Sequence, residues 1–109
     1  MNTSKFNGLV EEQFEKCRLL LGMKNDEYTP ENDDRLVYFK KAAVLEHNTP
    51  KAALLGMLMK HIISISDMCI DGTTTFSQAR WEEKITDAMN YLLLLKGLTV
   101  EESDEQNRS

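Results

Sequence analysis

Polar side chains recur at helical spacing in two segments of the second half of the chain. The first set is Lys60, Ser64 and Asp67, and the second is Glu83, Asp87 and Asn90. Intervals of four and three residues place each set on one face of an α-helix. If the two faces meet, they form a cleft of mixed charge in which Lys60 or Lys84 pairs with a carboxylate of the second set. The alternative is two solvated faces with ordinary ion pairs inside each helix.

Other side chains have the chemistry to hold a phosphate and a ring. Lys60 and the adjacent His61 present a charge and a hydrogen-bond donor, although a lone histidine is more often structural. Tyr28 lies in a polar stretch, where an aromatic ring either stacks on a ligand or pins the loop to the protein. The predicted ligand-binding residues are Lys24, Asn25, Tyr28, Lys60, His61, Lys84, Asp87 and Asn90. Such a site requires no metal or other cofactor.

Several chemistries lack their signatures. The chain has no nucleophilic triad, Walker loop or glycine-rich dinucleotide fingerprint, so acyl transfer and P-loop phosphoryl transfer are unsupported. Cys17 and Cys69 show no zinc-ligand spacing and are predicted to be packed thiols. The formal net charge of −5 argues against non-specific binding to nucleic acid or to an anionic membrane.

Hydrophobic periodicity predicts an all-α protein of four helices, over about residues 8–21, 33–46, 50–70 and 77–95. Thr49-Pro50 and Ser77 are helix starts, and Gly22 and Gly97 are expected stops. We expect one four-helix bundle-like domain over residues 1–98, because 109 residues suffice for one core. Residues 24–32 are predicted to form a loop, and the acidic residues 99–109 a disordered tail.

The helix predicted over residues 50–70 is apolar on almost its whole circumference, which is typical of a central helix or of one covered by another subunit. We therefore expect a homo-oligomer. Lys60 and His61 interrupt its apolar run, and residues 1–5 have no apolar signal-peptide core. The sequence predicts no membrane span and a cytoplasmic protein.

Several short motifs together resemble a group of small phage- and prophage-encoded helical proteins, mostly without assigned function. The motifs are Lys24-Asn25-x-x-Tyr28, Asp34-Arg35-Leu36 with Phe39, Lys60-His61 with Ser64 and Asp67, and the segment from Trp81 to Leu92. Phages use small oligomeric helical proteins to sequester nucleotide immune signals. The resemblance therefore implies a non-catalytic nucleotide sponge that counteracts defence in the bacterial host cytoplasm.

The acidic helices are also distantly similar to the MazG-like all-α nucleoside triphosphate pyrophosphohydrolases, which hold Mg²⁺ with ExxE and ExxD motifs. Glu12 and Glu15 form an ExxE pattern, whereas Glu83 and Asp87 stand one residue farther apart than ExxD requires. This second hypothesis assigns those four carboxylates to Mg²⁺, which prefers hard oxygen ligands. A third hypothesis is a structural or protein-interaction subunit without a ligand. Dependence on magnesium distinguishes the enzyme from the sponge.

Overall fold

The computed structural model describes the backbone of residues 1–28 and 34–108, and the side chains of residues 1–22 and 34–108. These parts of the chain contain four helices and no strand: α1 (Thr3–Tyr28), α2 (Val37–Glu46), α3 (Pro50–Ile70) and α4 (Gln78–Arg108). The predicted all-α class is therefore confirmed.

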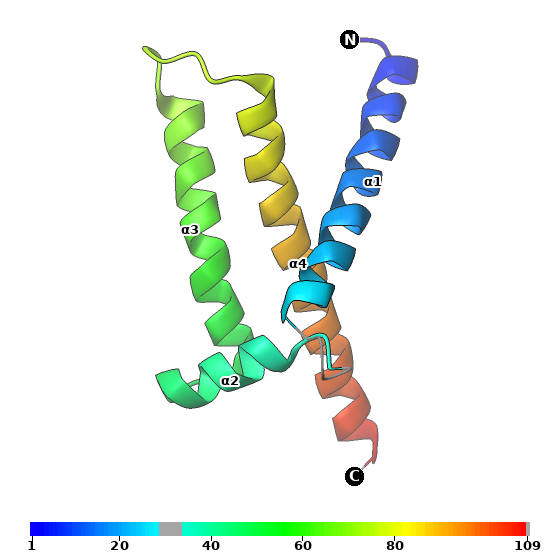
Figure 1. The fold of residues 1–109 in the computed structure, drawn as a ribbon, viewed down its shortest axis with the longest axis vertical. Helices are drawn as coiled ribbons and strands as arrows, with labels where there is room; N and C mark the ends of the chain where they lie inside the picture. Colours follow the sequence, from blue (N-terminus) through cyan, green and yellow to red (C-terminus); the bar gives the residue numbers. More distant parts are fainter. Residues whose placement is uncertain (29–33, 109) are drawn as a thin grey trace.

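The four helices form an open arrangement around α4 (Figure 1). Helices α3 and α4 run antiparallel side by side, α2 lies across the beginning of α3, and α1 packs on α4 and diverges from it toward the N-terminus. The radius of gyration is 16.5 Å, whereas a compact domain of this length has about 13 Å. One copy of the chain is thus more open than a closed bundle.

Two of the predicted helix starts have the expected capping geometry. The Thr49 hydroxyl accepts a hydrogen bond from the Ala52 amide at 3.2 Å, and Pro50 occupies the first turn of α3. The Ser77 hydroxyl accepts from the Arg80 amide at 3.1 Å. Both caps satisfy amides that have no partner inside the helix.

Helices α1 and α4 extend beyond their predicted ends. Helix α1 begins at Thr3, where the Asn2 side chain accepts from the Lys5 amide at 2.8 Å, and it continues through Gly22 and the predicted loop to Tyr28. Helix α4 continues through Gly97 to Arg108, over the residues predicted as a disordered tail. No described glycine has a positive φ. A glycine inside a helix costs only about 1 kcal/mol, so a single glycine does not by itself end a helix.

The core lies between α2, α3 and α4. Its buried members come from all three helices and are Leu36, Phe39, Leu54, Leu58, Ala88 and Leu98. Leu36, just before α2, packs over Gly97 of α4, where a Cβ would lie in ordinary van der Waals contact with the Leu36 methyl groups at 3.5 Å. Cys17 is buried as predicted, but Cys69 is exposed.

Several large apolar side chains are exposed in one copy of the chain. Phe14 is 55% exposed and Leu45 is 82% exposed, and Ile85 and Leu92 of α4 are also exposed. On α4 the polar residues Thr86 and Asn90 are buried instead. Helix α4 packs against both α1 and α3, and Thr86 faces α1, where its hydroxyl accepts a hydrogen bond from Gln13.

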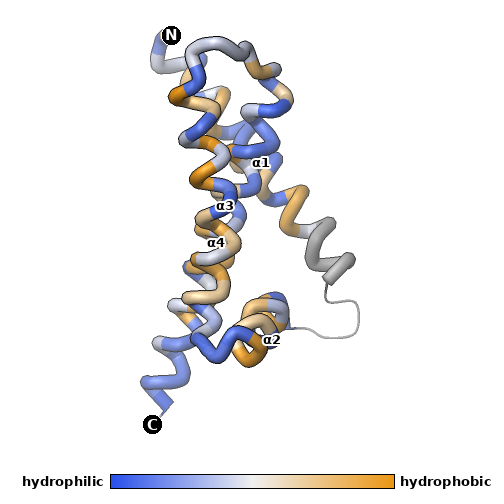
Figure 2. The backbone as a smooth tube through the Cα atoms, turned by 90° about the vertical axis from the view of Figure 1, so that its left-hand side faces the viewer, coloured by the Kyte–Doolittle hydropathy of each residue, from blue (hydrophilic) through white to orange (hydrophobic). Residues whose placement is uncertain are grey.

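Helix α3 remains largely uncovered. By length and composition it passes the test for a helix that crosses a membrane, although core helices of soluble proteins pass it too. Figure 2 shows the apolar character of α3 and of the middle of α4, and the hydrophilic last turns of α4. Lys60 lies at the middle of α3, where a charge in a bilayer centre costs about 2.5–3.5 kcal/mol.

An ion-pair network anchors α2 to the end of α4. The Lys40 ammonium lies 2.6 Å from an Asp34 carboxylate oxygen and 2.6 Å from a Glu101 oxygen. Nearby, Lys51 pairs with Glu102 at 2.8 Å. The hydrogen bond from Lys40 lowers the pKa of Asp34, and the same bond, followed by that to Glu101, raises the pKa of Lys40. Residues 101 and 102 thus belong to the folded contact surface.

We predict that Lys40→Met lowers the free energy of unfolding by up to about 1 kcal/mol, the upper range for a partly exposed ion pair. Two carboxylates lose their cation, and the melting temperature falls by a few degrees in thermal denaturation followed by circular dichroism. Lys41→Met, at the exposed neighbouring lysine, is the control and leaves the melting temperature unchanged.

The effect of Lys40→Met depends on pH with a defined sign. The folded-state pKa of Asp34 is below its ordinary value of 3.8, so its contribution is complete above pH 3.8 and disappears as the pH falls through the folded value. We expect the difference between Lys40→Met and the native protein to shrink below pH 3.8. An undiminished difference at pH 2 would contradict this account.

Candidate functional site

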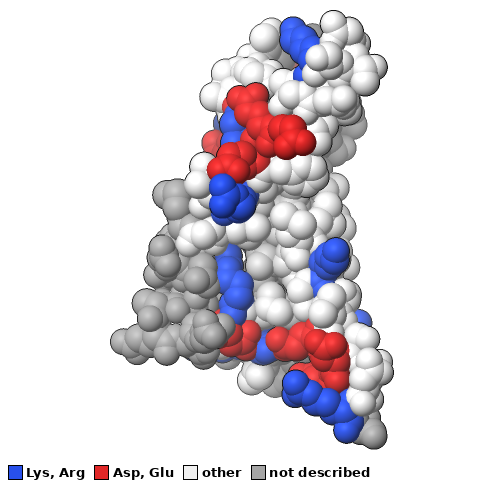
Figure 3. Space-filling view, turned by 90° about the vertical axis from the view of Figure 1, so that its right-hand side faces the viewer, with Lys and Arg blue, Asp and Glu red and all other residues white. Residues whose placement is uncertain are grey.

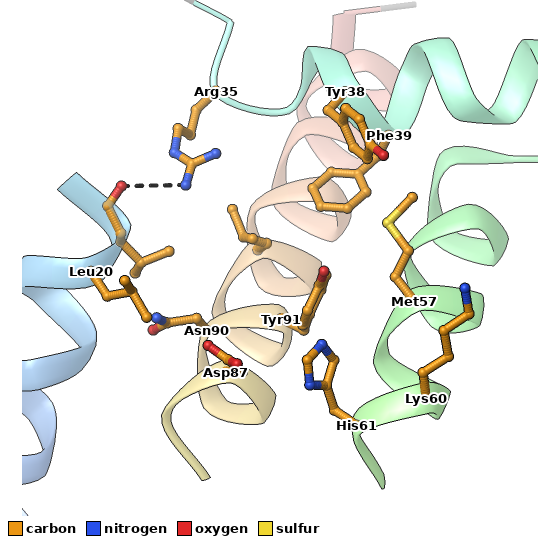
Figure 4. A pocket seen from close by; sticks show the side chains of 12 residues that line it. Leu20, Arg35, Tyr38, Phe39, Met57, Lys60, His61, Asp87, Asn90 and Tyr91 are labelled. Carbon is orange, nitrogen blue, oxygen red and sulfur yellow. Dashed lines mark hydrogen bonds between the residues drawn. The ribbon is translucent and has the colours of Figure 1, made fainter. Parts of the chain in front are cut away.

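A cavity of about 270 Å³ opens between α1, α3, α4 and the beginning of α2 (Figure 4). Leu20 and Leu21 of α1 form one wall, and Met57 of α3 forms the opposite wall. The remaining lining residues are Arg35, Tyr38, Phe39, Lys60, His61, Asp87, Asn90, Tyr91 and Leu94. Four segments that are distant in sequence therefore build this one cavity.

The cavity brings together parts of the two polar sets. Lys60 and His61 reach it from α3, and Asp87 and Asn90 from α4. The predicted meeting of the two faces is thus found for these residues, whereas Ser64, Asp67 and Glu83 do not line the cavity. Among the described side chains, no ion pair joins Lys60 or Lys84 to Asp87 or Glu83. The cleft is formed without the expected pairing.

An aromatic wall runs along the side of the cavity nearest α2 and α3. The rings of His61 and Tyr91 lie 5.1 Å apart between centroids, with their planes inclined by 37°. Phe39 meets Tyr91 edge to face at 6.5 Å, and Tyr38 meets Phe39 at 5.8 Å. These contacts fix the orientation of the rings. They place a π surface next to the polar residues of α4.

Asn90 carries a buried acceptor without a partner. The residue is only 7% exposed, and among the described residues its Oδ1 atom has no hydrogen-bond donor. A buried acceptor left unsatisfied costs about 1–3 kcal/mol, and buried polar atoms normally have a partner. Asn90 lines the cavity beside Asp87, on the side of α1 (Figure 4). The residue lines the cavity, but the oxygen itself is enclosed, so a donor in the cavity reaches it only after the amide turns toward that space.

Two basic side chains and one carboxylate set the charge of the cavity. Arg35 donates to the Leu21 carbonyl at 3.4 Å, which links the beginning of α2 to α1. Lys60 is exposed at the α3 side, and Asp87 supplies the negative charge. Figure 3 shows one face on which the acidic side chains gather in an upper and a lower group, with separate Lys and Arg side chains in the stretch between them. The cavity therefore has one more basic than acidic side chain.

The remaining predicted ligand residues are distributed differently. Lys84 is half-buried on α4 but does not line the cavity. The side chains of Lys24, Asn25 and Tyr28 lie outside the described residues. Conversely, Arg35, Tyr38 and Phe39 line the cavity but were not predicted as ligand residues. Arg35 and Phe39 belong to the Asp34-Arg35-Leu36 and Phe39 motif, and this motif was the only feature of the sequence that singled them out.

The four carboxylates of the magnesium hypothesis are not grouped. Glu12 and Glu15 are exposed on α1, where Glu15 pairs with Arg18 at 2.6 Å. Helix α1 faces α4 with other residues: Gln13 donates to the Thr86 hydroxyl at 2.8 Å, and Lys16 pairs with Glu82. Within residues 1–22 and 34–108, no three His, Cys, Asp or Glu side chains form a group suited to a metal ion.

We predict that Asn90→Leu stabilises the ligand-free protein by about 1 kcal/mol. The substitution removes the buried, unsatisfied amide oxygen and keeps a side chain of similar shape. Urea denaturation monitored by circular dichroism measures the free energy of unfolding.

Thr86→Val is the matched control on the same helix. The Thr86 hydroxyl is also buried but accepts from Gln13, so its removal leaves that donor without its acceptor. We expect Thr86→Val to lower the free energy of unfolding by about 1 kcal/mol. If both substitutions change stability in the same direction, the assignment of Asn90 as unsatisfied fails.

The chain matches no protein-family model, no curated protein and no solved structure in the comparisons made. The likeness to phage proteins and to MazG-like enzymes therefore remains a prediction from the sequence motifs.

Proposed function

We propose that this cavity binds a small anionic nucleotide and that the protein sequesters it without catalysis. The observation that carries the proposal is a cavity that combines an aromatic wall with two basic side chains, and that is also lined by Asn90, whose enclosed Oδ1 has no donor among the described residues. Concave, mostly apolar cavities with a few convergent polar groups are the usual form of small-molecule sites.

The ring of the ligand fits the inner part of the cavity. The His61–Tyr91 pair offers a surface for stacking, and a nucleobase presents a flat π face. Asn90 Oδ1 and the Asp87 carboxylate, three residues apart on α4, are acceptors for N–H groups at the edge of a base. This arrangement favours a base whose edge carries hydrogen-bond donors.

The phosphate fits the basic residues. Arg35 provides a planar guanidinium suited to a phosphate, and Lys60 provides a point charge from the opposite helix. The volume of about 270 Å³ is near the lower end of the range of about 300–1,000 Å³ for ligand sites. A mononucleotide, or one nucleotide unit of a larger signal molecule, matches this size.

The residues around the cavity support sequestration. Binding through stacking, hydrogen bonds and cations needs no metal, and the described residues offer aromatic rings and cations rather than a carboxylate cluster. The resemblance to phage proteins supports a sponge for a nucleotide immune signal in the cytoplasm of a bacterial host.

Isothermal titration with mono-, tri- and cyclic nucleotides, each with Mg²⁺ or with EDTA, tests the proposal. We expect at least one nucleotide to bind equally well in EDTA and to be recovered intact by chromatography. Consumption of a triphosphate only in Mg²⁺ would establish the pyrophosphohydrolase instead. Absence of binding to every nucleotide would support the protein-interaction subunit.

Variants of the basic residues localise the site. We expect Arg35→Gln and Lys60→Gln each to weaken binding by about tenfold, the equivalent of about 1.4 kcal/mol. Lys84→Gln removes the same charge from α4 outside the cavity and leaves the affinity unchanged. Equal losses in all three variants would show that net charge, not the cavity, determines binding.

A further inference from the structure

The face of α3 opposite the cavity carries a row of exposed apolar side chains. Leu55 is more than half exposed, and Met59 and Ile62 are each 42% exposed. Ile63, which lies just outside this row, is also more than half exposed. We call this row the outer seam of α3, and it consists of Ala52, Leu55, Met59, Ile62, Ser66 and Cys69. Successive members are separated by alternating intervals of three and four residues.

This spacing is that of a helix that packs lengthwise against another helix. Alternating intervals of three and four keep one row facing a partner at a shallow crossing angle. The inner face of α3 has the same kind of row, including Leu54 and Leu58, which pack on α2 and α4. The outer seam has no such partner among the described residues, although no member of the seam is charged.

Helix α4 extends the apolar face. Helical position places the cavity residues of α3 and α4 on one side of the pair, and it places Ile62 of α3 and Ile85 and Leu92 of α4 on the opposite side. Ile85 and Leu92 are exposed. The face is about 26 Å long from residue 52 to residue 69 and, over two helices, about 20 Å wide. That area, on the order of 500 Å² in projection, is about two thirds of the roughly 800 Å² per partner of a standard interface.

We propose that a second copy of this chain covers this face, with the two outer seams packed antiparallel about a two-fold axis at Ile62. In this register Leu55 faces Cys69 of the partner subunit and Met59 faces Ser66 of the partner subunit. Each large side chain thus meets a small one, and Ile62 meets its own copy. Parallel packing would instead place large residues on large ones and small on small.

Antiparallel packing agrees with two further features of the chain. It opposes the dipoles of the two α3 helices. It also pairs the α3–α4 layer of one copy with that of the other, which produces a four-helix arrangement around apolar side chains. A bilayer fits the same helix less well, because Lys60 would lie at its centre.

The proposed dimer leaves the cavity accessible. Lys60 and the other cavity residues lie on the side of α3 that faces away from the outer seam. The dimer is therefore independent of the proposed nucleotide binding, and either can fail without the other.

Cysteine cross-linking tests the register. Cys17 is buried, which leaves Cys69 as the exposed native thiol. We expect Leu55→Cys to form a disulfide-linked dimer with Cys69 of the partner subunit under mild oxidation, whereas the native protein and the Leu55→Cys, Cys69→Ser double variant remain unlinked. The control Val44→Cys, at an exposed site on α2, remains unlinked. Cross-linking of the native protein, or of the Leu55→Cys, Cys69→Ser double variant, would show parallel packing and overturn the antiparallel register.

Analytical ultracentrifugation tests the dimer itself. We expect the native protein to sediment as a dimer at micromolar concentration, and Ile62→Glu to weaken dimerisation on the order of a hundredfold because two carboxylates meet at the axis. Val44→Glu remains a dimer. Circular dichroism checks that each variant is folded. A native monomer, or a dimer unaffected by Ile62→Glu, overturns the proposal.

Flotation with phosphatidylcholine–phosphatidylglycerol vesicles tests whether a membrane, rather than a second copy of the chain, covers this face. We expect the native protein to remain with the unbound fraction. A protein that floats with vesicles and sediments as a monomer without them would identify the outer seam as a membrane face, and the dimer would be rejected.

Discussion

The pairing of α3 with α4 is the contact on which the rest of the structure depends. Leu54 and Leu58 of α3 and Ala88 and Leu98 of α4 share one buried cluster, and α2 closes it with Leu36 and Phe39. Because α3 is apolar on several sides, contact with one neighbouring helix buries only part of its apolar surface, and the rest stays exposed to water.

The two buried polar residues of α4 differ in whether their side-chain oxygen has a hydrogen-bond donor. Thr86 meets Gln13 of α1, whereas Asn90, one turn later, has an oxygen without a donor. Proteins tolerate such local conflicts where a ligand resolves them. Thr86 therefore makes a packing contact, whereas Asn90 is a candidate binding contact. The presence or absence of a hydrogen-bond partner distinguishes these two roles more clearly than the charge of the residues does.

The sequence predicted the helical class, the helix starts at Thr49 and Ser77, and the participation of Lys60, His61, Asp87 and Asn90 in one cleft. These features depend on local capping chemistry and helical spacing. The ends of α1 and α4 were not predicted, because tertiary contacts decide whether a glycine ends a helix. Arg35 was also missed as a site residue, since its place at the cavity depends on how α2 crosses α3 and α4.

Helix α1 has a distinct role among the walls of the cavity. Its buried contacts are concentrated around Cys17, and its first turns carry the exposed Phe6 and Leu9. Few buried contacts mean a low free energy of local opening, so α1 belongs to the part of the chain that exchanges its amide hydrogens early. The cavity thus lies between a stable helix pair and a wall that opens more readily. For the nucleotide proposed above, opening of α1 would provide a route into and out of the cavity without unfolding of the core.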